Sequence, residues 1–139
     1  MNHIEKSKEL GLSADEYVLV GGSVLDIYNI RNSDDIDMVV SKEAFSKLKN
    51  ENGWVIDADF KMKWGRERLL NGVFEIVQDL NFEYCSYLLS FELLRDAANC
   101  IDGVNVQPLG LLLLGKKDMG REKDLADIAL IEEYFNNKS

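Results

Sequence analysis

Residues Tyr17 to Ser41, which read YVLVGGSVLDIYNIRNSDDIDMVVS, organise the rest of this chain. The apolar run Val18 to Val20 predicts a buried strand, and the two glycines after it predict a tight turn where backbone can approach a ligand. Apolar residues at roughly helical spacing then predict a helix that begins at Ser23, so that a helix N-terminus faces whatever lies over the glycines. Free amides and the positive end of a helix dipole favour a phosphate group at such a place.

A second strand is expected from Ile36 to Val40. Because side chains alternate along a strand, Asp35 and Asp37 project from one face while the residues between them reach the core. Two carboxylates on one face suit a hard divalent cation, which a nucleoside triphosphate brings with it as a magnesium complex. A merely solvated strand face would leave two like charges about 7 Å apart without benefit. We therefore predict that Asp35 and Asp37 bind metal, with Asp34 out of phase in the loop.

A third carboxylate is needed for two-metal phosphoryl transfer, in which the cations lie about 3.5–4 Å apart. Glu75 is the leading candidate because apolar residues flank it on a predicted strand, and Asp57 and Asp79 are its rivals. The simpler interpretation is that Glu75 forms a cross-strand ion pair with Arg68, worth about 0.2–1 kcal/mol. If none of the three reaches the metals, the general base is missing, and triphosphate binding would remain without nucleotide transfer.

Three motifs carry a family resemblance: Gly21-Gly22-Ser23, then Arg31-x-Ser33-x-Asp35-x-Asp37, and finally Lys116 followed by Gly120-Arg121-x-Lys123-Asp124-Leu125-x-Asp127. Their order resembles the signature of the DNA polymerase beta-type nucleotidyltransferase superfamily, in which a Gly-Gly/Ser turn precedes an Asp-x-Asp strand by about this distance. The resemblance is closest to small, single-domain members, including toxins and proteins of unknown role. Each motif is common alone, whereas their order and spacing together are fairly specific.

The resemblance implies magnesium-dependent transfer of a nucleoside monophosphate from a nucleoside triphosphate to an acceptor hydroxyl or phosphate, with Mn²⁺ as an alternative ion. Asp35 and Asp37 would hold the cations, and Glu75, where family members generally carry Asp, would orient or deprotonate the acceptor. The residues expected to bind the nucleotide are Gly21, Gly22, Ser23, Arg31, Ser33 and Lys116.

One of these binding residues, Arg31, has a simpler role open to it. Arg31 and Ser33 would position phosphate or metal-bound water, but Arg31 equally fits a charge at the C-terminus of a helix, where it interacts with the helix dipole. Both interpretations of Arg31 stay open. Lys116 follows a six-residue apolar run and is expected to contact the ligand.

The last helix is expected from Arg121 to about Asn136. Its apolar residues at helical spacing predict an inward stripe of Leu125, Ile128, Ile131 and Phe135. Its first turn is expected to carry two surface ion pairs, Lys123 with Asp127 at i, i+4 and Arg121 with Asp124 at i, i+3.

Other local signals predict the remaining elements. Ser41 should cap a helix that runs to Asn50, and a strand should run from Trp54 to Phe60. Pro108 should begin a helix that ends near Lys117. One or two short helices are expected between Phe82 and Ala98.

Two glycine dipeptides predict hairpins. Asn71-Gly72 should form a type I′ turn, and its expected strand pairs are Leu70 with Val73, Leu69 with Phe74, and Arg68 with Glu75. Asp102-Gly103 should pair Asn99-Cys100-Ile101 with Val104-Asn105-Val106.

Length and charge bound the fold and the partners. A chain of 139 residues is expected to form a single domain, residues 1–139, of the α/β (α+β) class, with a small mixed or antiparallel sheet and helices mainly on one side. The charge of −9, from 16 basic and 25 acidic residues, argues against a broad nucleic-acid surface. The expected acceptor is therefore a small molecule, an RNA end or a protein, and an oligomer or protein partner fits the small size.

The N-terminus is polar, and no apolar run approaches the ~20 residues that span a bilayer. We expect a cytoplasmic protein without a membrane segment. The chain has two cysteines and one histidine, His3, near an N-terminus expected to be frayed. These are too few for a zinc site or a Ser-His or Cys-His nucleophile.

The alternative function is a nucleotidyltransferase-like domain that has lost turnover and serves as a binding or regulatory module, for example in a toxin–antitoxin pair. The glutamate at position 75, the lack of a substrate domain and the acidic composition favour this alternative. Metal-dependent release of pyrophosphate distinguishes the two. A purely structural domain fits only if neither nucleotide nor metal binds.

Overall fold

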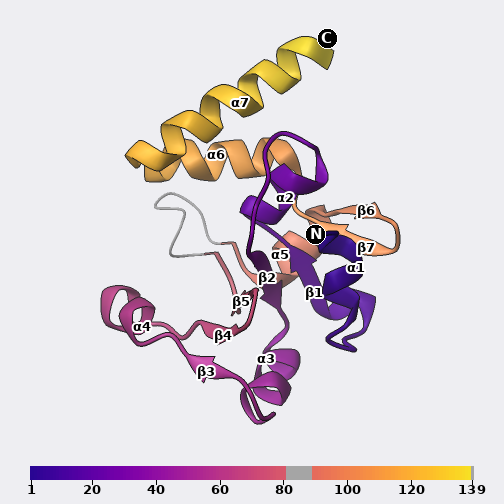
Figure 1. The fold of residues 1–139 in the computed structure, drawn as a ribbon, viewed down its shortest axis with the longest axis vertical. Helices are drawn as coiled ribbons and strands as arrows, with labels where there is room; N and C mark the ends of the chain where they lie inside the picture. Colours follow the sequence, from indigo (N-terminus) through magenta and orange to yellow (C-terminus); the bar gives the residue numbers. More distant parts are fainter. Residues whose placement is uncertain (81–88, 139) are drawn as a thin grey trace.

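The computed structural model describes residues 1–80 and 89–138, which form a mixed α+β fold around one seven-stranded sheet, as the sequence predicted (Figure 1). The strand order is β3-β4-β5-β2-β1-β7-β6. The strands are β1 Tyr17–Leu19, β2 Ile36–Val40, β3 Val55–Ile56, β4 Leu69–Asn71, β5 Phe74–Val77, β6 Asn99–Ile101 and β7 Val104–Val106. The α-helices are α1 His3–Lys8, α2 Gly22–Ile27, α3 Lys42–Lys49, α4 Ala58–Trp64, α5 Phe91–Ala97, α6 Leu109–Met119 and α7 Glu122–Lys138, with a 3₁₀ turn at Ala14–Glu16.

The sheet is mixed because its central pair, β1 and β2, is antiparallel while the outer neighbours of both strands, β7 and β5, run parallel to them. Alternation along these strands divides the core in two. The larger core lies on the face covered by α1, α2, α3, α6 and α7, and the smaller lies under α4 and α5. Helices therefore cover mainly one face, as expected, but not exclusively.

Alternation along β2 confirms the predicted phase of Asp37, whereas Asp35 lies in the bend just before the strand. Ile36, Met38 and Val40 belong to the larger core, and Val39 belongs to the smaller. Asp37 therefore shares the face of the smaller core, where β2 has a polar side chain in place of an apolar one.

The two predicted hairpins are both present, but one register is wrong. Asp102 and Gly103 have φ values of 50° and 81°, as a type I′ turn requires, and the β6–β7 pairs are those expected. Around Asn71-Gly72 the pairs are instead Asn71 with Phe74, Leu70 with Glu75 and Leu69 with Ile76. Asn71 remains in the strand and only Gly72, with φ 58°, adopts the left-handed conformation, so the loop is Gly72-Val73 and the turn resembles type II′.

Caps account for most helix boundaries. Ser41 Oγ accepts the Ala44 amide at 3.1 Å and begins α3, as predicted. Pro108 is the N-cap of α6, close to its expected place. The strand expected to reach Phe60 is wrong, because the Asp57 carboxylate accepts the Phe60 amide at 3.2 Å and begins α4 after only two residues of strand.

In the segment expected to be helical between Phe82 and Ala98, the structure has α5. Residues 82–88 of that prediction lie outside the described residues. No helix in the described part of the chain combines the length and apolar character needed to cross a membrane.

The predicted inward stripe of the last helix is right at Ile131 and wrong at Leu125 and Phe135. In α7, Leu125 is 58% exposed and Phe135 is 41% exposed, whereas Ile131, Asp124 and Asp127 are buried. The helix is rotated from the orientation that its apolar residues favour, and the cations that lie opposite the two buried aspartates explain why.

Candidate functional site

A cleft of about 1000 Å³ lies between the glycine turn, the loop before β2, helix α4 and the α6–α7 pair. This volume is at the upper end of the range for small-molecule sites, about 300–1000 Å³. All but one of the predicted site residues line it; they are Gly21, Gly22, Arg31, Ser33, Asp35, Asp37, Glu75 and Lys116. The structure therefore brings together residues that are up to 95 positions apart in sequence, from Gly21 to Lys116.

The carboxylates of Asp35, Asp37 and Glu75 line one part of the cleft, which we call its floor. Asp37 and Glu75 are directly paired across the parallel strands β2 and β5, whose backbones run about 4.8 Å apart. Asp35 lies two residues before Asp37, in the bend that leads into β2. The pKa of Asp35 is raised, first by partial burial and then by the negative charges of Glu75 and Asp34, with Arg68 opposing them. A cation placed among these carboxylates would reverse that penalty.

The two rivals of Glu75 have other partners. Asp57 caps α4 and pairs with Arg68 at 2.6 Å, a contact that lowers the pKa of Asp57. Asp79 pairs with Arg66. The Arg68–Glu75 ion pair suggested by the sequence is present but longer, at 3.9 Å, so Arg68 is held chiefly by Asp57.

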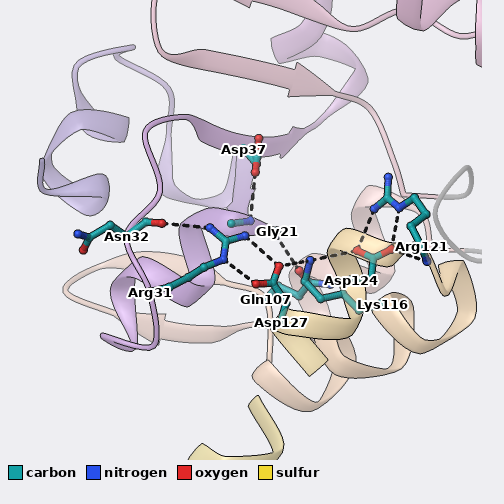
Figure 2. Close-up of polar contacts among 10 residues, drawn as sticks. Gly21, Arg31, Asn32, Asp37, Gln107, Lys116, Arg121, Asp124 and Asp127 are labelled. Carbon is teal, nitrogen blue, oxygen red and sulfur yellow. Dashed lines mark hydrogen bonds and ion pairs between the residues drawn. The ribbon is translucent and has the colours of Figure 1, made fainter. Parts of the chain in front are cut away.

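The glycine turn packs directly against Asp37. Gly21 has φ 59° and ψ −134°, a conformation open essentially to glycine alone. The Gly22 amide donates to Asp37 Oδ2 at 3.1 Å, and the Gly21 amide donates to Gln107 Oε1 at 3.2 Å (Figure 2). The expectation of free amides is therefore wrong for these two groups, because side chains from β2 and from the end of β7 satisfy them. The turn therefore fixes the orientation of the Asp37 carboxylate, which is part of the cleft floor.

Replacing Gly21 by Ala should destabilise the fold and disturb Asp37 together. The backbone conformation alone costs about 1–3 kcal/mol for a residue with a side chain, and the added Cβ would lie 2.9 Å from Asp37 Oδ2. Gly65→Ala is the matched control, because Gly65 also has a positive φ, 68°, but no atom within 4 Å of an added Cβ. We expect about 1–2 kcal/mol there. Urea unfolding measures both, and equal losses would contradict the proposed contact with Asp37.

Ser23 is the predicted site residue that does not line the cleft. Its side chain is fully buried beneath the turn, where Oγ accepts the Asp37 amide at 3.0 Å and lies 2.9 Å from His3 Nδ1. The hydroxyl therefore holds the backbone of the aspartate strand, in place of the phosphate contact that the sequence suggested.

His3 is a site-supporting residue that sequence reasoning missed. Its Nε2 lies 3.0 Å from the Ser33 carbonyl and 3.2 Å from the Asp26 carboxylate, both of which only accept hydrogen bonds, so Nε2 carries a proton. The side chain is buried, and the predicted fraying of the N-terminus is therefore wrong. A single histidine outside any motif gives no sequence signal of this role.

Opposite the carboxylates, an ion-pair network joins the loop before β2 to both C-terminal helices (Figure 2). Arg31 makes two hydrogen bonds to Asp127, at 2.6 and 2.9 Å. Lys116 lies 3.0 Å from Asp127 and 3.5 Å from Asp124. Arg121 bonds Asp124 at 2.7 and 3.1 Å. We call these five residues the Arg31–Arg121 network. Its three cations and two buried carboxylates give it a net charge of one positive unit, and it lies beside the cleft.

One of the two ion pairs predicted for the last helix is absent as a result. Asp127 faces inward to Arg31 and Lys116, so the surface pair with Lys123 is wrong, whereas Arg121 does pair with Asp124, although Asp124 is buried. Lys123 is exposed at the cleft and makes no ion pair with any described residue. Arg31 is held by a carboxylate of α7, which neither sequence interpretation anticipated.

The network should make stability fall in acid. Burial alone would raise the pKa of Asp127, but hydrogen bonds from Arg31 and Lys116 and their charges outweigh burial and lower it; Arg121 does the same for Asp124. A carboxyl group whose pKa is lower in the folded state stabilises the fold above its unfolded pKa, about 3.9, and loses that contribution as pH falls through the folded value.

We therefore expect the free energy of unfolding to decline below about pH 4. Asp127→Asn should flatten the decline in urea titrations at each pH, and Glu5→Gln, a change at an exposed carboxylate of α1, should leave it intact. An Asp127→Asn profile that keeps the wild-type slope would contradict this assignment.

The carboxylates of Asp35, Asp37 and Glu75 are the candidate ligands for the expected magnesium ion. Within residues 1–80 and 89–138, no three His, Cys, Asp or Glu side chains are already grouped to hold a metal ion. Mg²⁺ is commonly bound by only one or two carboxylates, with waters and substrate phosphates completing its shell. Asp35 and Asp37 would fit this mode if water or a bound ligand supplied the remaining oxygens. No family model, curated protein or solved structure matches this chain.

Proposed function

We propose that this protein is a magnesium-dependent nucleotidyltransferase that moves a nucleoside monophosphate from a nucleoside triphosphate to an acceptor. One observation carries the proposal: the same cleft is lined by the carboxylates of Asp35, Asp37 and Glu75 and by the cations of Arg31 and Lys116. A magnesium triphosphate combines a cation with several anionic oxygens, and this charge pattern complements it.

The residues divide the work as follows. Asp35 and Asp37 would hold Mg²⁺, or Mn²⁺, which neutralises developing phosphate charge when bound. Lys116 and Arg31 would contact triphosphate oxygens from the opposite wall. The acceptor oxygen attacks the α-phosphorus. The bond from that phosphorus to the oxygen that bridges the α- and β-phosphates breaks, and pyrophosphate leaves. Glu75, beside Asp37, takes the proton of the acceptor.

The acceptor is a small molecule, an RNA end or a protein, in keeping with the charge of −9. The alternative, a binding or regulatory module without turnover, is favoured by one observation, that no three metal-binding side chains among the described residues are grouped in advance. Such a module would bind magnesium triphosphate and release no pyrophosphate.

Thermal unfolding against each nucleoside triphosphate, with and without magnesium, tests binding first. A ligand at about 100 times its dissociation constant stabilises the folded state by roughly 2.7 kcal/mol. We expect a magnesium-dependent rise in melting temperature, followed by release of labelled pyrophosphate with candidate acceptors. Stabilisation without pyrophosphate release would favour the binding module, and no stabilisation by any nucleotide would reject both.

A further inference from the structure

The two aspartates of the cleft floor are held in place in different ways. Asp37 belongs to β2, where pairing with β5 fixes its backbone, and the Gly22 amide holds its carboxylate. Asp35 lies in the bend before the strand, ahead of Ile36, the first residue of β2 that pairs. Two carboxylates bind one cation well only if both are held in the right geometry. The cation site therefore depends on the contacts that fix the bend.

The bend is fixed chiefly through Ser33. Its hydroxyl donates to the Asp35 carbonyl at 3.2 Å, a shorter contact than the 3.4 Å from Ser23 Oγ to the same oxygen. Its amide donates to the Asp26 carboxylate at 2.8 Å. A Cβ added at Gly22 would lie 2.8 Å from Ser33 Oγ, so the glycine turn packs closely against this side chain. Any displacement of Ser33 would therefore move Asp35.

His3 holds Ser33 from helix α1. The imidazole is enclosed, with 0% of the side chain exposed, and its Nε2 proton points to the Ser33 carbonyl at 3.0 Å. The Asp26 carboxylate lies 3.2 Å from the same nitrogen and also accepts the Ser33 amide. Both polar groups of the Ser33 backbone are thus held by one histidine–aspartate pair. Because the ring is enclosed, these hydrogen bonds are protected from competing water.

The other ring nitrogen of His3 supports Asp37. Nδ1 accepts the Ser23 hydroxyl at 2.9 Å, because Nε2 carries the proton, and Ser23 Oγ accepts the Asp37 amide at 3.0 Å. Asp37 has independent support from strand pairing and from the Gly22 amide. The Nε2 contact instead serves the bend, where strand pairing has not yet begun. Of the two contacts, the one from Nε2 should matter more for the cation site.

We propose that His3 is a positioning residue: through Ser33, its Nε2 sets the place of Asp35 relative to Asp37 and thereby the affinity of the cleft for a divalent cation. This inference rests on the proposed function and identifies what prepares its metal site. Removing a group that orients a metal ligand typically lowers metal affinity about 10- to 100-fold. His3 acts through the backbone of the bend, so we expect the lower end of that range, about tenfold.

Mn²⁺ alone is the probe, because electron paramagnetic resonance measures the free ion directly and needs no turnover. His3→Gln places an amide donor near the position of Nε2, whereas the shorter side chain of His3→Asn reaches only the position of Nδ1. We expect His3→Ala and His3→Asn to bind Mn²⁺ about tenfold more weakly than the native chain, and His3→Gln to stay within about threefold of it. The double variant Asp35→Asn/Asp37→Asn gives the background from the other acidic side chains.

Ser7→Ala is the matched control. Ser7 is buried on the same helix, and its hydroxyl donates to the Ile4 carbonyl at 2.7 Å and lies 3.3 Å from the Tyr17 hydroxyl, both outside the cleft lining. This variant should lose stability in urea but bind Mn²⁺ within about twofold of the native chain. If His3 had only a structural role, Mn²⁺ affinity would instead follow stability across all the variants.

Three results would overturn the inference: native Mn²⁺ affinity in His3→Asn, equal affinities in His3→Asn and His3→Gln, or no binding by the native chain above the double variant. The comparison of His3→Asn with His3→Gln decides the matter even if His3→Ala does not fold. The proposed function is decided separately, because it fails if magnesium nucleotides neither stabilise the native chain nor release pyrophosphate.

Discussion

Replacing Asp35 and Asp37 together by Asn is expected to abolish nucleotide transfer and magnesium-dependent stabilisation while leaving the fold intact. Metal ions supply several kcal/mol of transition-state stabilisation in phosphoryl transfer, so the loss should be roughly 1000-fold or more in rate. The fold should tolerate the change because Asn oxygen can still accept the Gly22 amide that Asp37 Oδ2 now accepts at 3.1 Å. Removing the charge of Asp35 also relieves the cost of its partial burial and its repulsion by Glu75 and Asp34, which together raise the pKa of Asp35.

Asp34→Asn is the matched control for this variant. Asp34 is an exposed carboxylate next to Asp35 but out of phase with it, so its removal should lower transfer by less than about tenfold, the effect of one modest electrostatic contact. Labelled pyrophosphate release and thermal shifts measure all three proteins. A double variant that retains full activity would remove the two aspartates from the site.

Replacing Asp127 by Ala is expected to cost about 3–5 kcal/mol of stability, the range for removing one partner of a buried ion pair. Its side chain is 9% exposed, and its loss would leave Arg31 without its hydrogen-bonded carboxylate and Lys116, only 13% exposed, with Asp124 alone at 3.5 Å. The variant should also lose nucleotide affinity, because both cations would be free to leave the cleft wall. Urea unfolding gives the first quantity and thermal shifts with magnesium ATP the second.

Lys123→Ala serves as the control for that experiment. Lys123 is the residue that sequence spacing paired with Asp127, but it is exposed and lies on the cleft, so its removal should change stability by less than about 0.5 kcal/mol. Similar losses in both variants would restore the surface pair and contradict the buried network.

Local rules predicted the parts of the site that local geometry controls. Strand alternation placed Asp37 on the face opposite Ile36 and Met38, which reach the larger core, and Asp35, in the bend before the strand, lines the same cleft. The Asp102-Gly103 turn was also predictable, since both residues adopt the positive φ that a type I′ turn demands. At Asn71-Gly72 the same rule failed, because only Gly72 takes positive φ and the pairing moved with it.

Long-range partners account for the rest. The apolar stripe of the last helix gave the wrong buried face because Arg31, 96 residues away, holds Asp127 inward. His3 had no motif to mark it, yet it contacts Ser23 and the carbonyl of Ser33, 30 residues away. The spacing of residues within one helix cannot predict either contact.

The contacts that α1 and α7 make with residues 31–33 have a consequence for the synthesis of the protein. Ser33 is held from α1 and Arg31 from α7, through contacts that span 30 and 96 residues. Contacts between residues so far apart in sequence form late, because they must overcome a large loop-closure entropy. The ribosome also delivers α7 after the other described helices. The nascent chain therefore carries both aspartates long before it has a cleft, and ligand affinity should arise only as the final helix docks.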